Sequence, residues 1–312
     1  MLGTVTPYPL SRVRSVRRHR HAGPTISQDG WVRVAIGKDE RPHMVLARVR
    51  LGGSHARLRM RRLIHGAIGK TGFDAVPVSS IRHSTGRRAR LLRALQVDIV
   101  IDVGANSGQF ASELRAAGYR GRVISVEPMA SAYKKLSARA ARDPNWTTVR
   151  CALGESDGES TLHIAGNSAS SSLLEMLPVH EEAAPGTAYV GREGVTVRRL
   201  ESLLSEYVSA GSRAYLKVDV QGYELAVLRG AGPQLQALAA IQVELSLARL
   251  YAGAPMADEV NAFVIGSGYG LAGIEPGFAE PVSGRLLQMD AIYVRSDLLA
   301  QLPGGAPDMR AR

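Results

Sequence analysis

The 312-residue sequence is poor in cysteine and aromatic residues and has no long apolar run. Its single cysteine, Cys151, excludes a disulfide framework and a cysteine-rich metal site. No apolar run reaches the ~18 residues that span a membrane, and residues 1–10 lack the apolar core of a signal peptide. At 45% hydrophobic and 21% charged residues, the composition excludes a disordered chain and a coiled coil. We therefore expect a cytoplasmic protein with one large core and an appendage.

The positive charge is concentrated at one end of the chain. Residues 1–93 contain 20 Lys and Arg residues but only four acids, a formal charge of +16. The remaining residues contain 19 basic and 24 acidic residues, a charge of −5. Such a basic segment is typical of proteins that bind an anionic partner, either nucleic acid or a membrane surface.

The local patterns divide the chain into four parts. Residues 1–30 hold an arginine cluster and are predicted to be a disordered tail. Residues 31–93 are predicted to form a basic extension, with a short hairpin over 31–51 and basic helices over 56–68 and 83–95. The main domain is predicted to span 94–298, and a flexible tail 299–312.

Strands and helices alternate through the main domain, which predicts a parallel sheet with helices on both faces. Residues 165–195, rich in Ser, Gly, Pro and Glu, are predicted to form a long loop, and residues 160–164 a short extra strand. The main strands are predicted at 97–103, 122–127, 146–151, 214–219, 240–245, 269–274 and 289–295.

A glycine-rich turn follows the first buried strand, in the sequence Asp102-Val-Gly-Ala-Asn-Ser-Gly108. A turn at the carboxyl end of a central strand is where open α/β sheets bind nucleotides. The spacing differs from the Gly-x-Gly-x-x-Gly dinucleotide fingerprint. Because a carboxylate at Asp102 would repel a pyrophosphate, the motif favours a ligand with an ammonium group. The alternative is a tight turn without a ligand.

Glu127 ends the next strand, where a carboxylate can accept hydrogen bonds from both ribose hydroxyls. Together with the glycine-rich turn, Glu127 predicts a site for a nucleoside that has a positively charged end. S-adenosylmethionine is such a ligand. The alternative is an exposed carboxylate at a strand end.

A third motif, Lys217-Val-Asp-Val-Gln-Gly-Tyr-Glu224, ends the fourth main strand. Lys217 and Asp219 lie on the same face of a strand, so Asp219 is predicted to stand over the crevice. A structural ion pair followed by a helix start is the alternative interpretation. Glu224 suits the first turn of the helix that follows.

These motifs resemble the class I S-adenosylmethionine-dependent methyltransferases and, within them, the FkbM family. The resemblance covers about residues 90–296, although members commonly have Glu where Gln221 stands. It implies a Rossmann-like, mostly parallel seven-stranded α/β sheet whose last strand is antiparallel. It also implies transfer of a methyl group to a hydroxyl of a glycolipid sugar or a polyketide-type molecule. Besides the three motifs, it rests on residues 152–154, 168–174 and 197–203.

The resemblance also implies which residues bind S-adenosylmethionine. Glu127 would hold the ribose, Cys151 and Ala152 would flank the adenine, and Asp219 would face the methyl group. The residues expected to contact the cofactor are Asp102, Gly104, Ala105, Asn106, Gly108, Glu127, Pro128, Cys151, Ala152 and Asp219.

A sugar hydroxyl benefits from a general base, and three residues are candidates: Asp219, Glu244 and His180. His180 lies in the predicted loop, where a solvated segment is the favoured interpretation, and His163 is expected to be structural. No spaced ligand motif requires a metal, although the carboxylates leave Mg²⁺ open as an option.

Other functions compete with a small-molecule O-methyltransferase. The basic segment suggests a nucleic-acid substrate, which the absence of base-methylation motifs and of interleaved aromatics disfavours; an RNA ribose 2′-O-methyltransferase is the strongest such rival. The glycine spacing disfavours a nicotinamide oxidoreductase, and a scaffold with a vestigial pocket is a further alternative. For the basic segment, we expect peripheral contact with an anionic membrane that holds a glycolipid acceptor.

Overall fold

A computed structural model describes residues 31–36, 43–48, 80–81 and 83–304. The predicted tail 1–30 and the predicted helix over 56–68 lie outside this range. β1 (Trp31–Ile36) and β2 (His43–Arg48) pair antiparallel, which confirms the predicted hairpin. Both strands belong to one compact unit, Met1–Ala75, whereas the elements from α2 onward belong to a second, Val76–Arg312.

The second unit is built on the predicted seven-stranded sheet, with strand order β11-β12-β10-β9-β3-β4-β5. The neighbours from β10 to β5 pair in parallel, while β12 is antiparallel to both β10 and β11. The strands are β3 (Ile99–Val103), β4 (Arg122–Val126), β5 (Trp146–Val149), β9 (Ala214–Val218), β10 (Ala240–Ser246), β11 (Tyr269–Pro276) and β12 (Gln288–Arg295).

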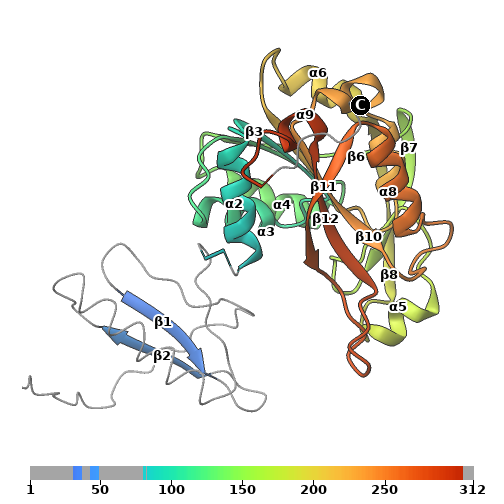
Figure 1. Cartoon of the computed structure of the whole chain (residues 1–312). Coiled ribbons are helices and arrows are strands. Elements are labelled where there is room, and N and C mark those ends of the chain that lie inside the picture. Colours follow the sequence, from blue (N-terminus) through green and yellow to red (C-terminus); the bar gives the residue numbers. More distant parts are fainter. Residues whose placement is uncertain (1–30, 37–42, 49–79, 82, 305–312) are drawn as a thin grey trace, which may run out of the picture. The chain divides into compact units, whose positions relative to one another are not determined.

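Helices cover both faces of this sheet, because successive strand residues point to opposite sides. On one face, Val100 and Tyr215 pack in a cluster with α2, α3 and α4. On the other, Ile101 and Leu216 pack in a cluster with α6, α7 and α8. Figure 1 shows α2, α3 and α4 gathered on one side of the sheet. The helices are α2 (Ser84–Ala94), α3 (Gln109–Ala116), α4 (Ala130–Ala140), α6 (Leu200–Tyr207), α7 (Glu224–Arg229), α8 (Ala257–Gly266) and the short α9 (Ser296–Leu299).

Helix α2 belongs to the sheet unit and not to the basic extension, so the predicted boundary at residue 93 lies inside this unit. The helix is basic on one side, but Leu92 and the adjoining Leu95 are buried in the core cluster beside α3. Arg88 is also buried and pairs with Glu275 of β11. The high charge of this segment hid its apolar face.

The segment predicted as a long loop, 165–195, contains helix α5 (Pro178–Ala183) and the first part of β8 (Tyr189–Arg199). β8 lies between β6 (Ala152–Gly154) and β7 (Gly158–Ala165) in a second, three-stranded sheet. β7 confirms the short strand predicted at 160–164. β8 was missed because only Val195 and Val197 of its side chains are buried, where they pack with Met129.

None of the helices in the described part of the chain combines the length and the apolar character needed to cross a membrane.

Candidate functional site

A cavity of about 520 Å³ opens at the carboxyl ends of β3, β4, β9 and β10. This is the edge at which doubly wound sheets place their ligands. The structure brings most of the predicted site residues together in its wall: Gly104, Ala105, Asn106, Glu127, Pro128, Cys151, Ala152, His180, Asp219 and Glu244.

The turn after β3 needs glycine at two positions. Gly104 has a φ of 79°, and a Cβ there would lie 1.8 Å from the backbone oxygen of Asp219. Gly108 has a φ of 84°, and a Cβ would meet Leu136 and Trp146 at 2.9 Å. Left-handed backbone favours glycine, and neither position has room for a side chain. The turn packs closely against the end of β9 at Gly104 and against α4 and β5 at Gly108.

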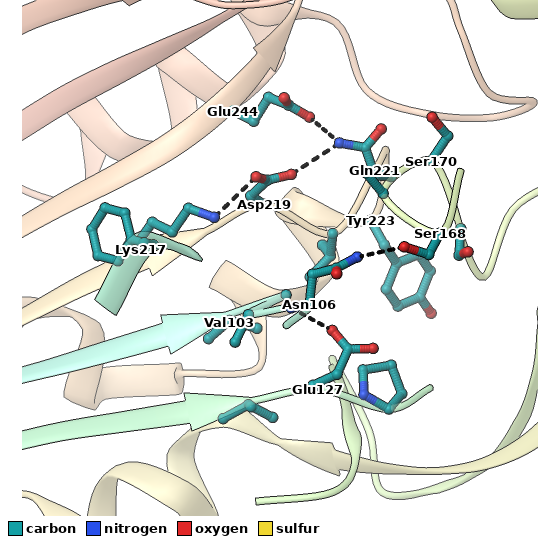
Figure 2. Close-up of a pocket in the computed structure, with 18 of the residues that line it drawn as sticks. Val103, Asn106, Glu127, Ser168, Ser170, Lys217, Asp219, Gln221, Tyr223 and Glu244 are labelled. Carbon is teal, nitrogen blue, oxygen red and sulfur yellow. Dashed lines mark hydrogen bonds and ion pairs between the residues drawn. The ribbon is translucent and has the colours of Figure 1, made fainter. Parts of the chain in front are cut away.

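Glu127 faces this turn from the end of β4 (Figure 2). Its Oε2 accepts a hydrogen bond from the backbone N–H of Asn106 at 2.7 Å, and its Oε1 accepts one from Met129 at 2.9 Å. Burial raises the pKa of this carboxyl to about 7, although both backbone donors favour the ionised form. Each carboxylate oxygen has a further lone pair with which to accept a ligand hydroxyl.

An apolar strip lies beside Glu127, formed by Pro128, Cys151, Ala152, Leu153 and Leu162. Burial raises the pKa of the Cys151 thiol to about 11, so the thiol stays protonated at neutral pH. Cys151 therefore suits an apolar contact with a flat ring and not the role of a nucleophile.

Two predicted cofactor residues do not line the cavity. Asp102 is completely buried beneath it, where it accepts a hydrogen bond from Ser125 at 3.1 Å and lies 3.9 Å from the Lys217 ammonium. Gly108 caps the start of α3 and packs against Leu136 and Trp146. Asp102 points into the sheet face that carries α3, and Gly108 serves helix packing, so the contact of these two residues with the cofactor stays a prediction.

The far end of the cavity is a polar patch on the sheet face that carries α2 and α3. Lys217 and Asp219 project from β9 and its carboxyl end to this face, as predicted, and their side chains are 2.9 Å apart. Glu244 of β10 receives a hydrogen bond from Gln288 of β12 at 2.6 Å, and Gln242 donates to Asp290 at 2.9 Å. The patch therefore combines carboxylates, amides and one ammonium group, which together can donate to and accept from hydroxyl groups.

The pKa values of the two central carboxyls of the patch, Asp219 and Glu244, are shifted in opposite directions. The Lys217 ammonium and hydrogen bonds hold the pKa of Asp219 below its usual value despite burial. Burial and the neighbouring Asp219 charge raise the pKa of Glu244 well above its usual value. Of the two, Asp219 is therefore the carboxyl that ionises more readily, and Glu244 holds its proton to higher pH.

Gln221 links the two carboxyls, as Figure 2 shows. Its side-chain Nε2 lies 2.9 Å from Asp219 Oδ1 and 2.7 Å from Glu244 Oε2. A serine-rich segment closes the cavity nearby, where the side chain of Asn106 donates to Ser168 Oγ at 3.3 Å.

His180 is buried and not solvated, which corrects the prediction of a solvated loop segment. It lies on α5, and its ring contacts those of Tyr251 and Phe278. Burial lowers its pKa, so the imidazole is neutral at pH 7. His163 is buried in β7 with its ring stacked on Tyr189, consistent with a structural role.

Sequence reasoning missed several lining residues that come from outside the recognised motifs. Arg88 of α2, Gln242 of β10 and Asp290 of β12 all reach the cavity wall. The strand residues could have been found in the sequence, because Gln242, Glu244 and Asp290 are polar residues in otherwise apolar strands. Arg88 carried no such signal among its basic neighbours.

Within the described residues, no group of three or more His, Cys, Asp or Glu side chains is arranged to hold a metal ion.

Comparison with known proteins gives one family and several more distant relatives. The family model described as the methyltransferase FkbM domain matches residues 102–271. The hexuronic acid methyltransferase AglP of Haloferax volcanii is 29% identical over 163 residues, which are 51% of this chain and 60% of that protein.

Solved structures with a similar arrangement include a methyltransferase FkbM from Methylobacillus flagellatus KT. It has a TM-score of 0.38 and 14% identity, and the match covers 62% of this chain and 43% of that one. Another is fibrillarin from Aeropyrum pernix, in complex with S-adenosyl-L-methionine. Its TM-score is 0.38 and its identity 12%, over 67% of this chain and 74% of that one.

Proposed function

The chain belongs to the FkbM methyltransferase family, and we propose that it transfers a methyl group from S-adenosylmethionine to a hydroxyl group of a sugar or polyketide-type small molecule. One observation carries the proposal. A carboxylate suited to a ribose, Glu127, and an ionised carboxylate suited to an acceptor hydroxyl, Asp219, line one cavity on either side of the Gly104 turn.

The residues at the Glu127 end fit the cofactor. The Glu127 oxygens have lone pairs left for the two ribose hydroxyls, and the apolar strip at Cys151 and Ala152 offers a surface for adenine. Ala105 and Asn106, next to the Gly104 turn, would flank the methionine part. When bound, S-adenosylmethionine supplies an electrophilic methyl group on a sulfonium.

The polar patch at the other end fits a hydroxyl-bearing acceptor. Asp219, Glu244 and Gln288 present oxygen and amide groups within one short stretch of the wall, and Phe278 adds an aromatic surface. The AglP relative is a hexuronic acid methyltransferase, which supports a sugar as acceptor. The match spans only 60% of that relative's length. A sugar as the acceptor of this chain is therefore our proposal.

Asp219 is the residue that we propose accepts the hydroxyl proton. It is ionised beside Lys217, and a positioned carboxylate raises the rate of such a transfer by about 10²- to 10⁴-fold. Glu244, which holds its proton to higher pH than Asp219, is suited to donate a hydrogen bond to the acceptor. His180 forms part of the wall beside Tyr251 and Phe278 and holds the acceptor in position.

The direct test is transfer of a radiolabelled methyl group from S-adenosylmethionine to cell extract, separated into lipid, nucleic-acid and small-molecule fractions. Methyl glycosides of glucose and of glucuronic acid serve as defined acceptors in parallel. Label in a sugar or lipid fraction that resists mild alkali is expected, because a methyl ether is stable where a methyl ester is cleaved. Label confined to RNA would instead support the ribose 2′-O-methyltransferase alternative.

A further inference from the structure

Backbone strain is concentrated at the cavity. Among the described residues, four other than glycine have a positive φ, and three of them line the cavity: Asn106, Ser168 and Gln221. A non-glycine residue in this conformation is strained and persists only where the surroundings enforce it. Gln221 has a φ of 59°, a conformation that favours glycine, yet the residue at this position is glutamine. The glycine of this turn is the next residue, Gly222.

The surroundings of Gln221 fix both its backbone and its side chain. Its carbonyl oxygen accepts a hydrogen bond from Ser172 Oγ at 2.7 Å. Its side-chain Oε1 lies 2.8 Å from the hydroxyl of the fully buried Tyr251, whose single proton is shared with the carbonyl of Ser170 at 3.1 Å. Oε1 is thus turned toward a hydroxyl donor, and Nε2 is turned toward the two carboxyls.

The position of Nε2 has a clear electrostatic consequence. Its two N–H groups are directed at Asp219 Oδ1, directly after β9, and at Glu244 Oε2, on the neighbouring β10. Two carboxyls this close repel each other when both are ionised. A neutral amide with two donors relieves that repulsion and sets the separation of the two groups, whereas a carboxylate at this position would add to the repulsion.

We propose that Gln221 is a positioning residue whose amide holds Asp219 and Glu244 at a fixed separation, with Asp219 aimed at the acceptor hydroxyl. The inference rests on the proposed function, since it concerns the same carboxylates. Gln221 acts through them and takes no proton itself. Its strained backbone is the cost of placing an amide where a glycine would fit the turn better.

Two substitutions separate this role from a purely structural one. Gln221→Gly removes the amide and also relieves the positive φ, so relief of backbone strain offsets part of the stability that is lost with the amide's hydrogen bonds. Gln221→Glu keeps the size of the side chain but replaces the amide donor with an acid. Gln236→Ala, at an exposed glutamine remote from the cavity wall, is the matched control.

The variants are compared in thermal melting, in binding of S-adenosylhomocysteine and in methyl transfer to methyl glucoside and methyl glucuronide. We expect Gln221→Gly to lower kcat by about 10- to 100-fold, because misplaced reacting groups cost about that much. Its affinity for S-adenosylhomocysteine should stay within about threefold of wild type. We expect Gln221→Glu to move the acidic limb of the kcat profile upward by about one pH unit, because it adds a third acid. A Gln221→Gly variant with wild-type kcat and pH profile would overturn the proposal.

A second measurement does not depend on the acceptor. Carbon-13 NMR of protein labelled at the Asp and Glu carboxyls follows the titration of Glu244, assigned by its loss in Glu244→Gln. Loss of the amide should shift this titration in both Gln221 variants and leave it unchanged in Gln236→Ala. An unaltered titration would contradict the bridging role. If the wild-type protein failed to bind S-adenosylhomocysteine, the proposed function would fail, while the titration would still decide the role of Gln221.

Discussion

At the scale of single residues, Asp219 is a buried carboxylate whose ionised form is stabilised by its neighbours. Lys217 lies 2.9 Å away and Gln221 donates to its other oxygen at 2.9 Å. A group so stabilised is a weaker base than one with a pKa near 7, but it is ionised at every physiological pH. Its contribution to catalysis therefore comes from position and charge together.

The substitution Asp219→Asn tests this contribution. We expect kcat to fall by about 10²- to 10⁴-fold, since the proton acceptor is removed while the shape of the side chain is kept. Affinity for S-adenosylmethionine should change far less. Stopped-time assays at saturating cofactor measure kcat, with Asp258→Asn on the exposed side of α8 as the control. Unchanged turnover in Asp219→Asn would show that Asp219 is not the base.

Glu127 predicts a pH dependence of cofactor binding. Its pKa is raised to about 7 by burial, and only the ionised form has both oxygens free to accept from the ribose hydroxyls. Affinity for S-adenosylmethionine should therefore weaken as the pH falls below about 7 and level off above it. Calorimetric titrations between about pH 6 and pH 8.5 measure this dependence.

The variant Glu127→Gln supplies the control for that series. It should weaken binding by about 10- to 100-fold, because hydrogen bonds to a charged group are worth about 1.5–3 kcal/mol. It should also flatten the pH dependence, since a carboxamide does not titrate in this range. A wild-type affinity that stayed constant over the series would count against Glu127 as the ribose ligand.

At the scale of elements, the contact between the β3 turn and the end of β9 brings the two halves of the site together. We expect Gly104→Ala to destabilise the protein by about 3 kcal/mol or more, because the new Cβ would overlap the backbone of Asp219 in a left-handed turn. Urea denaturation measures the loss. Gly266→Ala at the end of α8 is the control, because an added Cβ there would have no neighbouring atom within 4 Å. This substitution should be neutral or stabilising.

The elements also show what the sequence alone can predict. The strands of the main sheet were predictable because burial on both faces demands an apolar run such as residues 97–103. β8 was not, because two glycines and several charged residues break its pattern and its pairing with β7 decides its structure. A pairing between distant segments leaves no local signature in a single sequence.

The site follows the same rule. Glu127 and Asp219 were predictable because they follow buried strands directly, at the edge where ligands bind. The position of Asp102 beneath the cavity and the burial of His180 depend on neighbours from other strands and helices. The contributions of Arg88 and Asp290 depend on how α2 and β12 pack on the sheet.

At the scale of the whole molecule, the formal charge of +11 resides entirely in the N-terminal unit. Residues 1–75 hold 15 basic and four acidic residues, while residues 76–312 hold 24 of each. The unit that carries the cavity is therefore formally neutral, and the excess positive charge belongs to the N-terminal unit. We propose that this part brings the enzyme to an anionic membrane surface that holds the acceptor.

Vesicle binding tests this proposal. The full chain should cosediment with phosphatidylserine-containing vesicles and be released by salt, because each basic residue near such a surface contributes about 1 kcal/mol. The fragment 76–312 should not bind them and should keep its affinity for S-adenosylmethionine. Equal vesicle binding by the fragment and the full chain would contradict the proposal.

The central claim is that the cavity between Glu127 and Asp219 binds S-adenosylmethionine, and calorimetric titration of the full chain tests it most directly. We expect one S-adenosylmethionine to bind per chain at pH 8, and NADH to give no heat in the same cell. Absence of S-adenosylmethionine binding, or tight binding of NADH in its place, would contradict it.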